Sequence, residues 1–206
     1  MPVKSARTKK SFGGFGPGIS GKRILLSQEA LIEGVSGESE TVITDLTSVS
    51  NAAYDLVAGS QNLDTLKREL TAYFSDRLKT DSMFARTTGS DQGQFIASQV
   101  NQLATPWMKY FIQYDPAPVL EKVKCPVLAL DGSKDLQVPP EIDLAAIKTA
   151  LEKGGNKDVT TVELPDLNHL FQECKTGSPT EYAQIEQTFS PLALNEVTKW
   201  ILSKVR

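Results

Sequence analysis

The stretch PVLALD at residues 126–131, followed by GSKDLQVPP at 132–140, decides the fold class of this 206-residue chain. The first part is a continuous apolar run of strand length. A run without polar alternation is typical of a strand that is covered on both faces in a parallel sheet. The second part contains turn residues and leads into helical periodicity from about Glu141 to Lys153. The stretch therefore predicts a strand, a loop and a helix of an α/β protein.

The residues that follow repeat this order. Gly154-Gly155 is a C-terminal helix cap, and Asp158–Leu164 is a second strand candidate. A long loop at 165–177 comes next. Ser178–Glu181 then has the spacing of a capping box at the start of a helix. The order strand, helix, strand, helix indicates a βαβα unit with a parallel sheet. Only two strands are convincing in the whole chain, whereas an average sheet has about five or six.

The last helix is predicted from Ser190 to about Lys204. Its apolar residues recur at helical spacing, so we expect them to form its buried face. They are Leu194, Val197, Ile201 and Val205.

Before residue 115 the apolar periodicity is helical. Helices are predicted at 24–31, 42–56, 63–73 and 95–103, and residues 107–114 form an aromatic-rich turn or helix. The sequence thus divides into three parts: a glycine-rich and partly disordered N-terminal segment at 1–21, a helical part at 22–114, and a βαβα part at 115–206.

Composition excludes several functional classes. The formal net charge of −3 leaves no basic field that would hold a nucleic acid. No run approaches the ~18 apolar residues of a membrane span. Two cysteines and one histidine are too few for a zinc site of cysteines and histidines, and no motif for another metal or a cofactor is found, so neither is expected. Met1–Ser11 is basic but has no apolar core of a signal peptide, so the cytoplasm is the default compartment, and a transit peptide is the weaker alternative.

The single histidine, His169, follows the second predicted strand, and Asp135 follows the first. Both therefore lie at the carboxyl ends of parallel strands, where open α/β sheets place their sites. An acid there can orient the imidazole of a general base. Asp131 and Asp166 are alternative acids, and Cys174 is an alternative thiol nucleophile beside the histidine.

The loop GSKDLQVPP, a helix, a strand and then LPDLNHLFQ at 164–172 resemble the last two strand–loop units of an α/β-hydrolase. The closer resemblance is to bacterial serine hydrolases of the dienelactone-hydrolase and acyl-peptidase-like type. It implies that Asp135 is the acid and His169 the base of a catalytic triad. Gly16-Pro17-Gly18-Ile19 looks like the family's loop after the strand that follows the nucleophile helix, and residues 22–114 would then be the helical insertion, a cap over the site. The implied substrate is an ester, thioester or amide.

The chain departs from the family at the nucleophile, because no G-x-S-x-G pattern occurs in it. The expected fold is therefore an incomplete α/β-hydrolase, a helical cap followed by a C-terminal βαβα unit, and we expect the chain alone to be inactive. The alternative is a non-enzymatic module that binds a partner or forms a homodimer through the exposed edge of its sheet.

Aromatic side chains cluster before the first strand and beside the histidine. We expect some of them to line a substrate pocket beneath the cap, although packing between helices is the alternative for most. The pocket candidates are Trp107, Tyr110, Tyr114 and Phe171.

Overall fold

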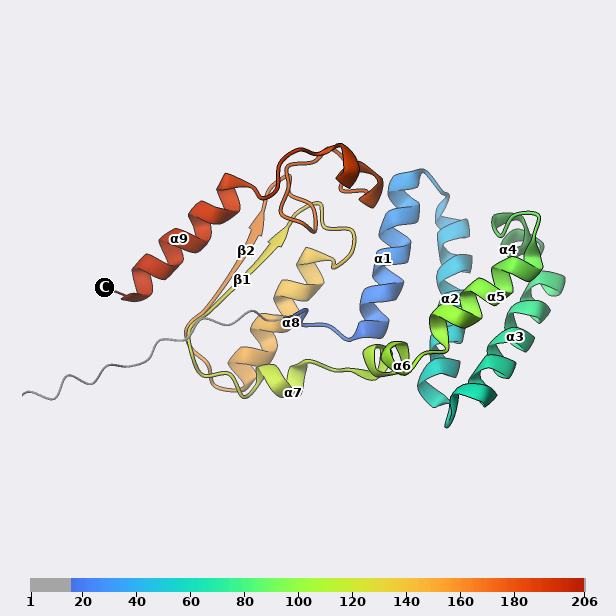
Figure 1. Ribbon diagram of the computed structural model, residues 1–206. Helices are drawn as coiled ribbons and strands as arrows, with labels where there is room; N and C mark the ends of the chain where they lie inside the picture. The colour runs from blue at the N-terminus through green and yellow to red at the C-terminus, as the bar shows by residue number, and fades with distance from the viewer. Residues whose placement is uncertain (1–15, 206) are drawn as a thin grey trace, which may run out of the picture.

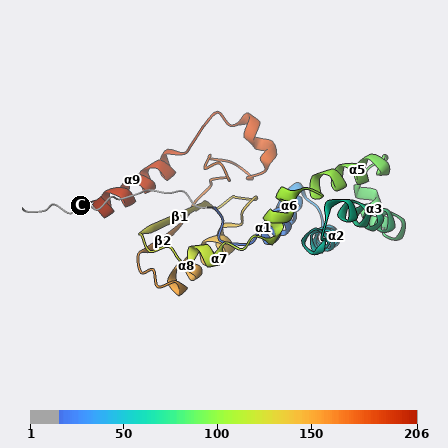
Figure 2. The same cartoon turned by 60° about the horizontal axis from the view of Figure 1, so that its bottom comes forward.

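The computed structural model describes residues 16–205, apart from the side chain of Thr87. The predictions for residues 1–15, which cover the basic end and most of the glycine-rich segment, lie outside the described residues. The elongated molecule in Figures 1 and 2 has helices at one end and a mixed helix and sheet part at the other. The helical part comprises α1 (Gly21–Ser36), α2 (Glu40–Gly59), α3 (Leu63–Thr80), α4 (Ser82–Thr87), α5 (Gln92–Leu103) and α6 (Pro106–Gln113).

The helical part has its own apolar core. Residues of α2 and α3 at helical spacing, such as Val57 and Leu70, are completely buried and pack together with α5 and α6. Capping side chains determine where these helices begin, since the Asn62 side chain accepts a hydrogen bond from Thr65 N and that of Asp91 from Gln94 N. The helices predicted in this region are present and mostly longer. The short α4 was not predicted.

The rest of the chain forms a parallel α/β unit. Its elements are α7 (Ala117–Leu120), β1 (Val127–Gly132), α8 (Pro140–Lys153), β2 (Val159–Leu164), the 3-10 helix η1 (Pro179–Gln184) and α9 (Pro191–Val205). The strands pair in parallel, from Val127 with Val159 to Gly132 with Leu164. Helix α8 covers one face of the sheet, and α9 lies on the other (Figures 1 and 2). The predicted α/β class is confirmed in this general form, with a sheet of two strands among the described residues.

The predicted buried face of the last helix is wrong. Leu194 is 54% exposed and Val205 is 46% exposed, while Val197 and Ile201 are half-buried. The only residue of α9 that is buried is Ala193. A sheet of two strands is too narrow to cover the apolar side of a helix with four turns, which is why the periodicity of the sequence overestimates the burial.

The capping box predicted at Ser178 has a different form. The Ser178 hydroxyl accepts from Thr180 N, and the Glu181 carboxylate accepts from Thr176 N and Gly177 N rather than from Ser178 N. The segment is therefore a short 3-10 helix anchored to the turn before it. Within residues 16–205 we find no helix that combines the length and the apolar character needed to cross a membrane.

Candidate active site

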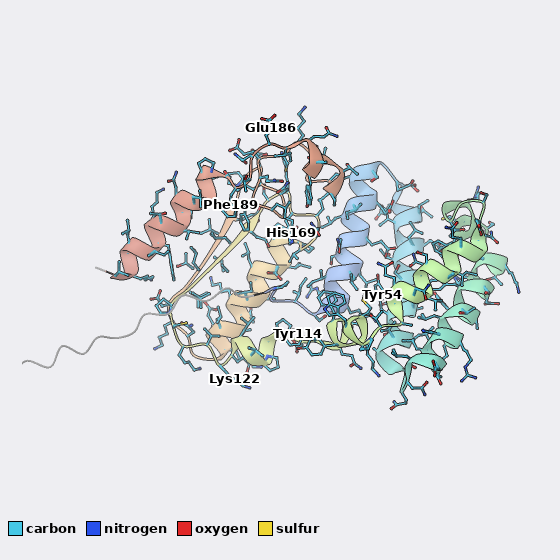
Figure 3. The ribbon with its side chains drawn as sticks, viewed as in Figure 1. Tyr54, Tyr114, Lys122, His169, Glu186 and Phe189 are labelled. Atoms are coloured by element: carbon cyan, nitrogen blue, oxygen red, sulfur yellow. The ribbon has the colours of Figure 1, made fainter. Side chains whose placement is uncertain are left out.

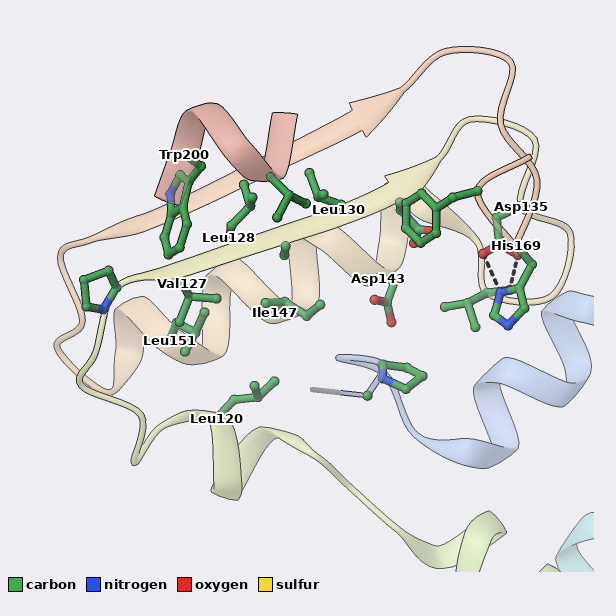
Figure 4. Close-up of a pocket in the computed structure, with 18 of the residues that line it drawn as sticks. Leu120, Val127, Leu128, Leu130, Asp135, Asp143, Ile147, Leu151, His169 and Trp200 are labelled. Carbon is green, nitrogen blue, oxygen red and sulfur yellow. Dashed lines mark hydrogen bonds and ion pairs between the residues drawn. The ribbon is translucent and has the colours of Figure 1, made fainter. Parts of the chain in front are cut away.

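The two predicted site residues meet at the carboxyl ends of the strands. Asp135 follows β1 and His169 follows β2, and His169 Nδ1 lies 2.7 Å from Asp135 Oδ2 (Figure 4). The Asp135 side chain is 3% exposed and that of His169 is 37% exposed. The carboxylate is therefore fixed in the protein interior, while the imidazole extends from it toward the surface.

Two backbone amides hold the Asp135 carboxylate in place. Its Oδ1 atom accepts hydrogen bonds from Gln137 N at 2.8 Å and from Val138 N at 2.9 Å. These bonds within the loop leave Oδ2 for the imidazole. The neutral histidine therefore carries its proton on Nδ1, and Nε2 is its basic nitrogen. Within residues 16–205 no hydroxyl or thiol is hydrogen-bonded to Nε2.

Asn168 shapes the turn that presents the histidine. Its side chain is completely buried, and Oδ1 accepts from Leu170 N and Gln172 N, each at 2.9 Å. Its Nδ2 atom donates to Gln172 Oε1. The turn also needs a left-handed backbone at Phe171, with φ of 55°. Asn168 is not among the residues predicted for the site, although an asparagine in a predicted turn is a signal for such side-chain bonds.

The acid loop and the histidine loop are joined by several hydrogen bonds. Ser133 N donates to Leu164 O at 2.8 Å, Lys134 N donates to Leu167 O at 2.9 Å, and Asp166 N donates to Ser133 Oγ at 2.9 Å. Because both loops are fixed to each other next to the strands, the Asp135–His169 contact is part of the fold and does not depend on two free side chains meeting.

The alternative site residues point elsewhere. The exposed Asp166 carboxylate lies 2.6 Å from Lys134 Nζ. The Cys174 thiol lies 3.5 Å from Asp166 O, and burial raises its pKa, which favours the unreactive protonated form. Asp131 is buried beside Asp135, and its Oδ1 accepts from Gly132 N. Among the three acids, only Asp135 contacts the histidine.

Three buried carboxyl groups gather at this end of β1. Burial, followed by the neighbouring charge of Asp135, raises the pKa of Asp131 to about 9, so its carboxyl holds a proton at neutral pH. Burial also raises the pKa of Asp143, whose Oδ1 accepts from Gly18 N at 2.8 Å. This last contact fixes the start of the described chain to α8. It was not predicted, since it joins residues far apart in sequence.

A hollow of about 670 Å³ begins beside the histidine and follows β1. We call it the β1 hollow. At one end lie Asp135, Asp143 and His169 (Figure 4). Asp131 and Phe171 also line the hollow, and the rest of its lining is mostly apolar. Its apolar lining comes from β1 and the helices beside it, namely Leu120, Val127, Leu128, Ala129, Leu130, Ile147, Leu151, Val197, Trp200 and Ile201.

The other predicted pocket residues are outside this hollow. Trp107 and Tyr110 are each 64% exposed on α6, and Tyr114 lines a separate, smaller hollow with Phe111. In Figure 3, Tyr114 lies at the end of α6, whereas His169 lies in the loop that follows β2. The ring centroids of Trp107 and Phe111 lie 5.0 Å apart, and this stacking within α6 accounts for part of the aromatic cluster predicted to line a pocket.

Comparisons of the chain with protein-family models, curated proteins and solved structures return no match. Across residues 16–205, no three histidine, cysteine, aspartate or glutamate side chains group closely enough to hold a metal ion.

The hydrogen bond from His169 to Asp135 raises the pKa of the imidazole above its ordinary value of 6.5, against the opposing effect of burial. Since His169 is the only histidine, a proton NMR titration of its ring reports this group alone. We expect a pKa above 6.5 in the native chain. In Asp135→Asn only the effect of burial remains, and the pKa should fall below 6.5. A pKa that does not change in this variant would contradict the pairing.

Proposed function

We propose that this chain carries the acid and the base of a serine-hydrolase site of the α/β-hydrolase type. The observation that supports the proposal is the 2.7 Å contact between Asp135 Oδ2 and His169 Nδ1 at the carboxyl ends of neighbouring parallel strands. In a triad of this type the residues follow the chain order nucleophile, acid, histidine, and the last two occur here in that order. The helical part, α1 to α6, corresponds in this proposal to the cap.

The chemistry assigned to the pair is proton transfer. His169 Nε2 takes the proton of a serine hydroxyl as its oxygen attacks the carbonyl carbon of an ester, thioester or amide. The imidazolium that forms is stabilised by the Asp135 carboxylate, and it then protonates the leaving group as the acyl-enzyme forms. In the second half of the reaction, His169 takes a proton from water as its oxygen attacks the acyl-enzyme. The proton then passes to the serine oxygen, and the carboxylic acid is released. In this proposal the serine and the oxyanion hole come from a further polypeptide segment that completes the site.

The proposal predicts that the chain alone does not turn over an ester. With p-nitrophenyl acetate we expect a rate no higher than that of N-acetylhistidine at the same concentration, because an imidazole without a serine or an oxyanion hole is only a weak nucleophile. The release of p-nitrophenolate is measured with the native chain, with His169→Ala and with N-acetylhistidine at the same concentration. Turnover well above the N-acetylhistidine rate that is lost in His169→Ala would mean that a nucleophile is present after all.

The accessibility of Nε2 is tested separately with diethyl pyrocarbonate, which modifies neutral imidazole. One histidine equivalent should react in the folded chain at a rate that follows the titration of His169. A histidine that reacts only after unfolding cannot serve as a base for an external nucleophile, and this result would overturn the proposed function.

A further inference from the structure

Neither edge of the two-stranded sheet has a partner strand among the described residues, and the edge formed by β1 borders the hollow beside the candidate site. Val127 N donates to Asp158 O and Ser133 N donates to Leu164 O, so the odd-numbered residues of this stretch face β2. In a parallel pair the alternate residues face away. The backbone N–H and C=O groups of Leu128 and Leu130 therefore point to the open edge of β1.

This open edge forms the floor of the β1 hollow. Ile147 and Leu151 of α8 line one side of the hollow, and Val197 and Trp200 of α9 line the other (Figure 4). The edge is thus recessed between two helices, and its surroundings over most of its length are apolar. Backbone groups in such surroundings need hydrogen-bond partners once water is displaced.

The dimensions and the chemistry of the hollow indicate what fits it. An acyl chain or another purely apolar ligand would cover the apolar walls but would leave the amides and carbonyls of Leu128 and Leu130 unpaired. An extended peptide supplies both kinds of contact. A hollow of about 670 Å³ that follows the six-residue β1 has room for a short strand segment.

We propose that the β1 hollow binds an extended, uncharged and β-branched strand of a separate polypeptide, which pairs with Leu128 and Leu130. A second copy of this chain fits poorly, because its own β1 edge is recessed in the same way between α8 and α9, and its β2 edge carries the charged Glu163. The residues before Gly16 are also poor candidates, since they include Lys9, Lys10 and the pair Gly13-Gly14. The proposal does not depend on the role of His169.

The test uses the full chain and the synthetic peptide Lys-Lys-Val-Val-Ile-Val-Val-Gly-Lys. In Trp107→Phe, Trp200 is the only tryptophan and lies in the wall of the hollow. Saturable binding should shift its emission to shorter wavelengths. Amide hydrogen exchange by NMR should become slower at Leu128 and Leu130 on binding, with much smaller changes at Ala129, whose N–H already faces β2.

Two variants of α9 provide a matched comparison. Val197→Asp places a carboxylate in the wall of the hollow and should weaken peptide binding at least tenfold. Leu194→Asp makes the same change on an exposed part of the helix outside the hollow, and binding should remain within twofold of the native value. The absence of saturable binding, equal weakening by both variants, or protection of Leu128 and Leu130 through self-association without peptide would overturn the proposal.

Discussion

Replacing Gly132 with alanine should lower the free energy of unfolding by about 2–3 kcal/mol and release the histidine loop from β1. Gly132 is the last residue of β1, where the loop that carries His169 crosses it. A Cβ atom at this position would lie 2.2 Å from Leu167 O and 2.9 Å from Asn168 O. Both atoms belong to backbone that is already fixed by hydrogen bonds, so the loop itself has to move.

The movement should also be visible at the site. As the loop shifts, the contact from His169 to Asp135 lengthens, and the pKa of the histidine should fall toward or below 6.5. Urea unfolding monitored by tryptophan fluorescence measures the stability, and the NMR titration measures the pKa. Gly59→Ala is the control, because Gly59 ends α2 with open space around it, and alanine there should leave the stability unchanged or raise it by about 0.5–1 kcal/mol. A native pKa in Gly132→Ala would show that the loop accommodates the methyl group.

The sequence predicted the local elements of the site well, since they depend on neighbouring residues. The apolar run at 126–131 corresponds to β1, and the turn residues after it place Asp135 in a loop. The order of the two strand–loop units then brings Asp135 and His169 together, because parallel neighbouring strands end at the same edge of a sheet.

The features that the sequence did not predict depend on distant contacts. The bond between Gly18 and Asp143 joins residues 125 positions apart. The exposure of Leu194 depends on the width of the sheet beneath α9, and helical periodicity alone cannot show whether an apolar face has a partner. Trp107 and Tyr110 were assigned to a pocket from their residue type, although packing within a short helix explains an aromatic cluster equally well.

The second large effect is expected at Asp131, where Asp131→Asn should stabilise the protein at alkaline pH. The native carboxyl keeps its proton up to a pKa of about 9, because it is buried beside Asp135. In the unfolded chain it ionises near its ordinary pKa of 3.8. Between these values the unfolded state binds fewer protons than the folded state, so the stability contributed by this group falls as the pH rises.

Asparagine has the shape of the protonated carboxyl but does not ionise. Its Oδ1 atom can accept from Gly132 N as the aspartate does, and its Nδ2 atom can donate to Asp135 in place of the acid proton. At pH 8 we expect the variant to be about 2–4 kcal/mol more stable than the native chain, and this difference should disappear toward pH 4. Urea unfolding across this pH range measures both curves.

The neighbouring side chains of the site are present in both proteins, so the difference between the two curves reports the replacement of the Asp131 carboxyl. The contribution of the His169–Asp135 pair is present below pH 6.5 and is lost as the pH rises through the raised pKa of the histidine. Asp131→Ala is the contrasting variant, because it leaves Gly132 N without its acceptor and should destabilise the chain throughout the range. If the stability of the native chain and that of Asp131→Asn change in parallel with pH, Asp131 is ionised in the folded protein. The carboxylates of Asp131 and Asp135 would then both be charged side by side.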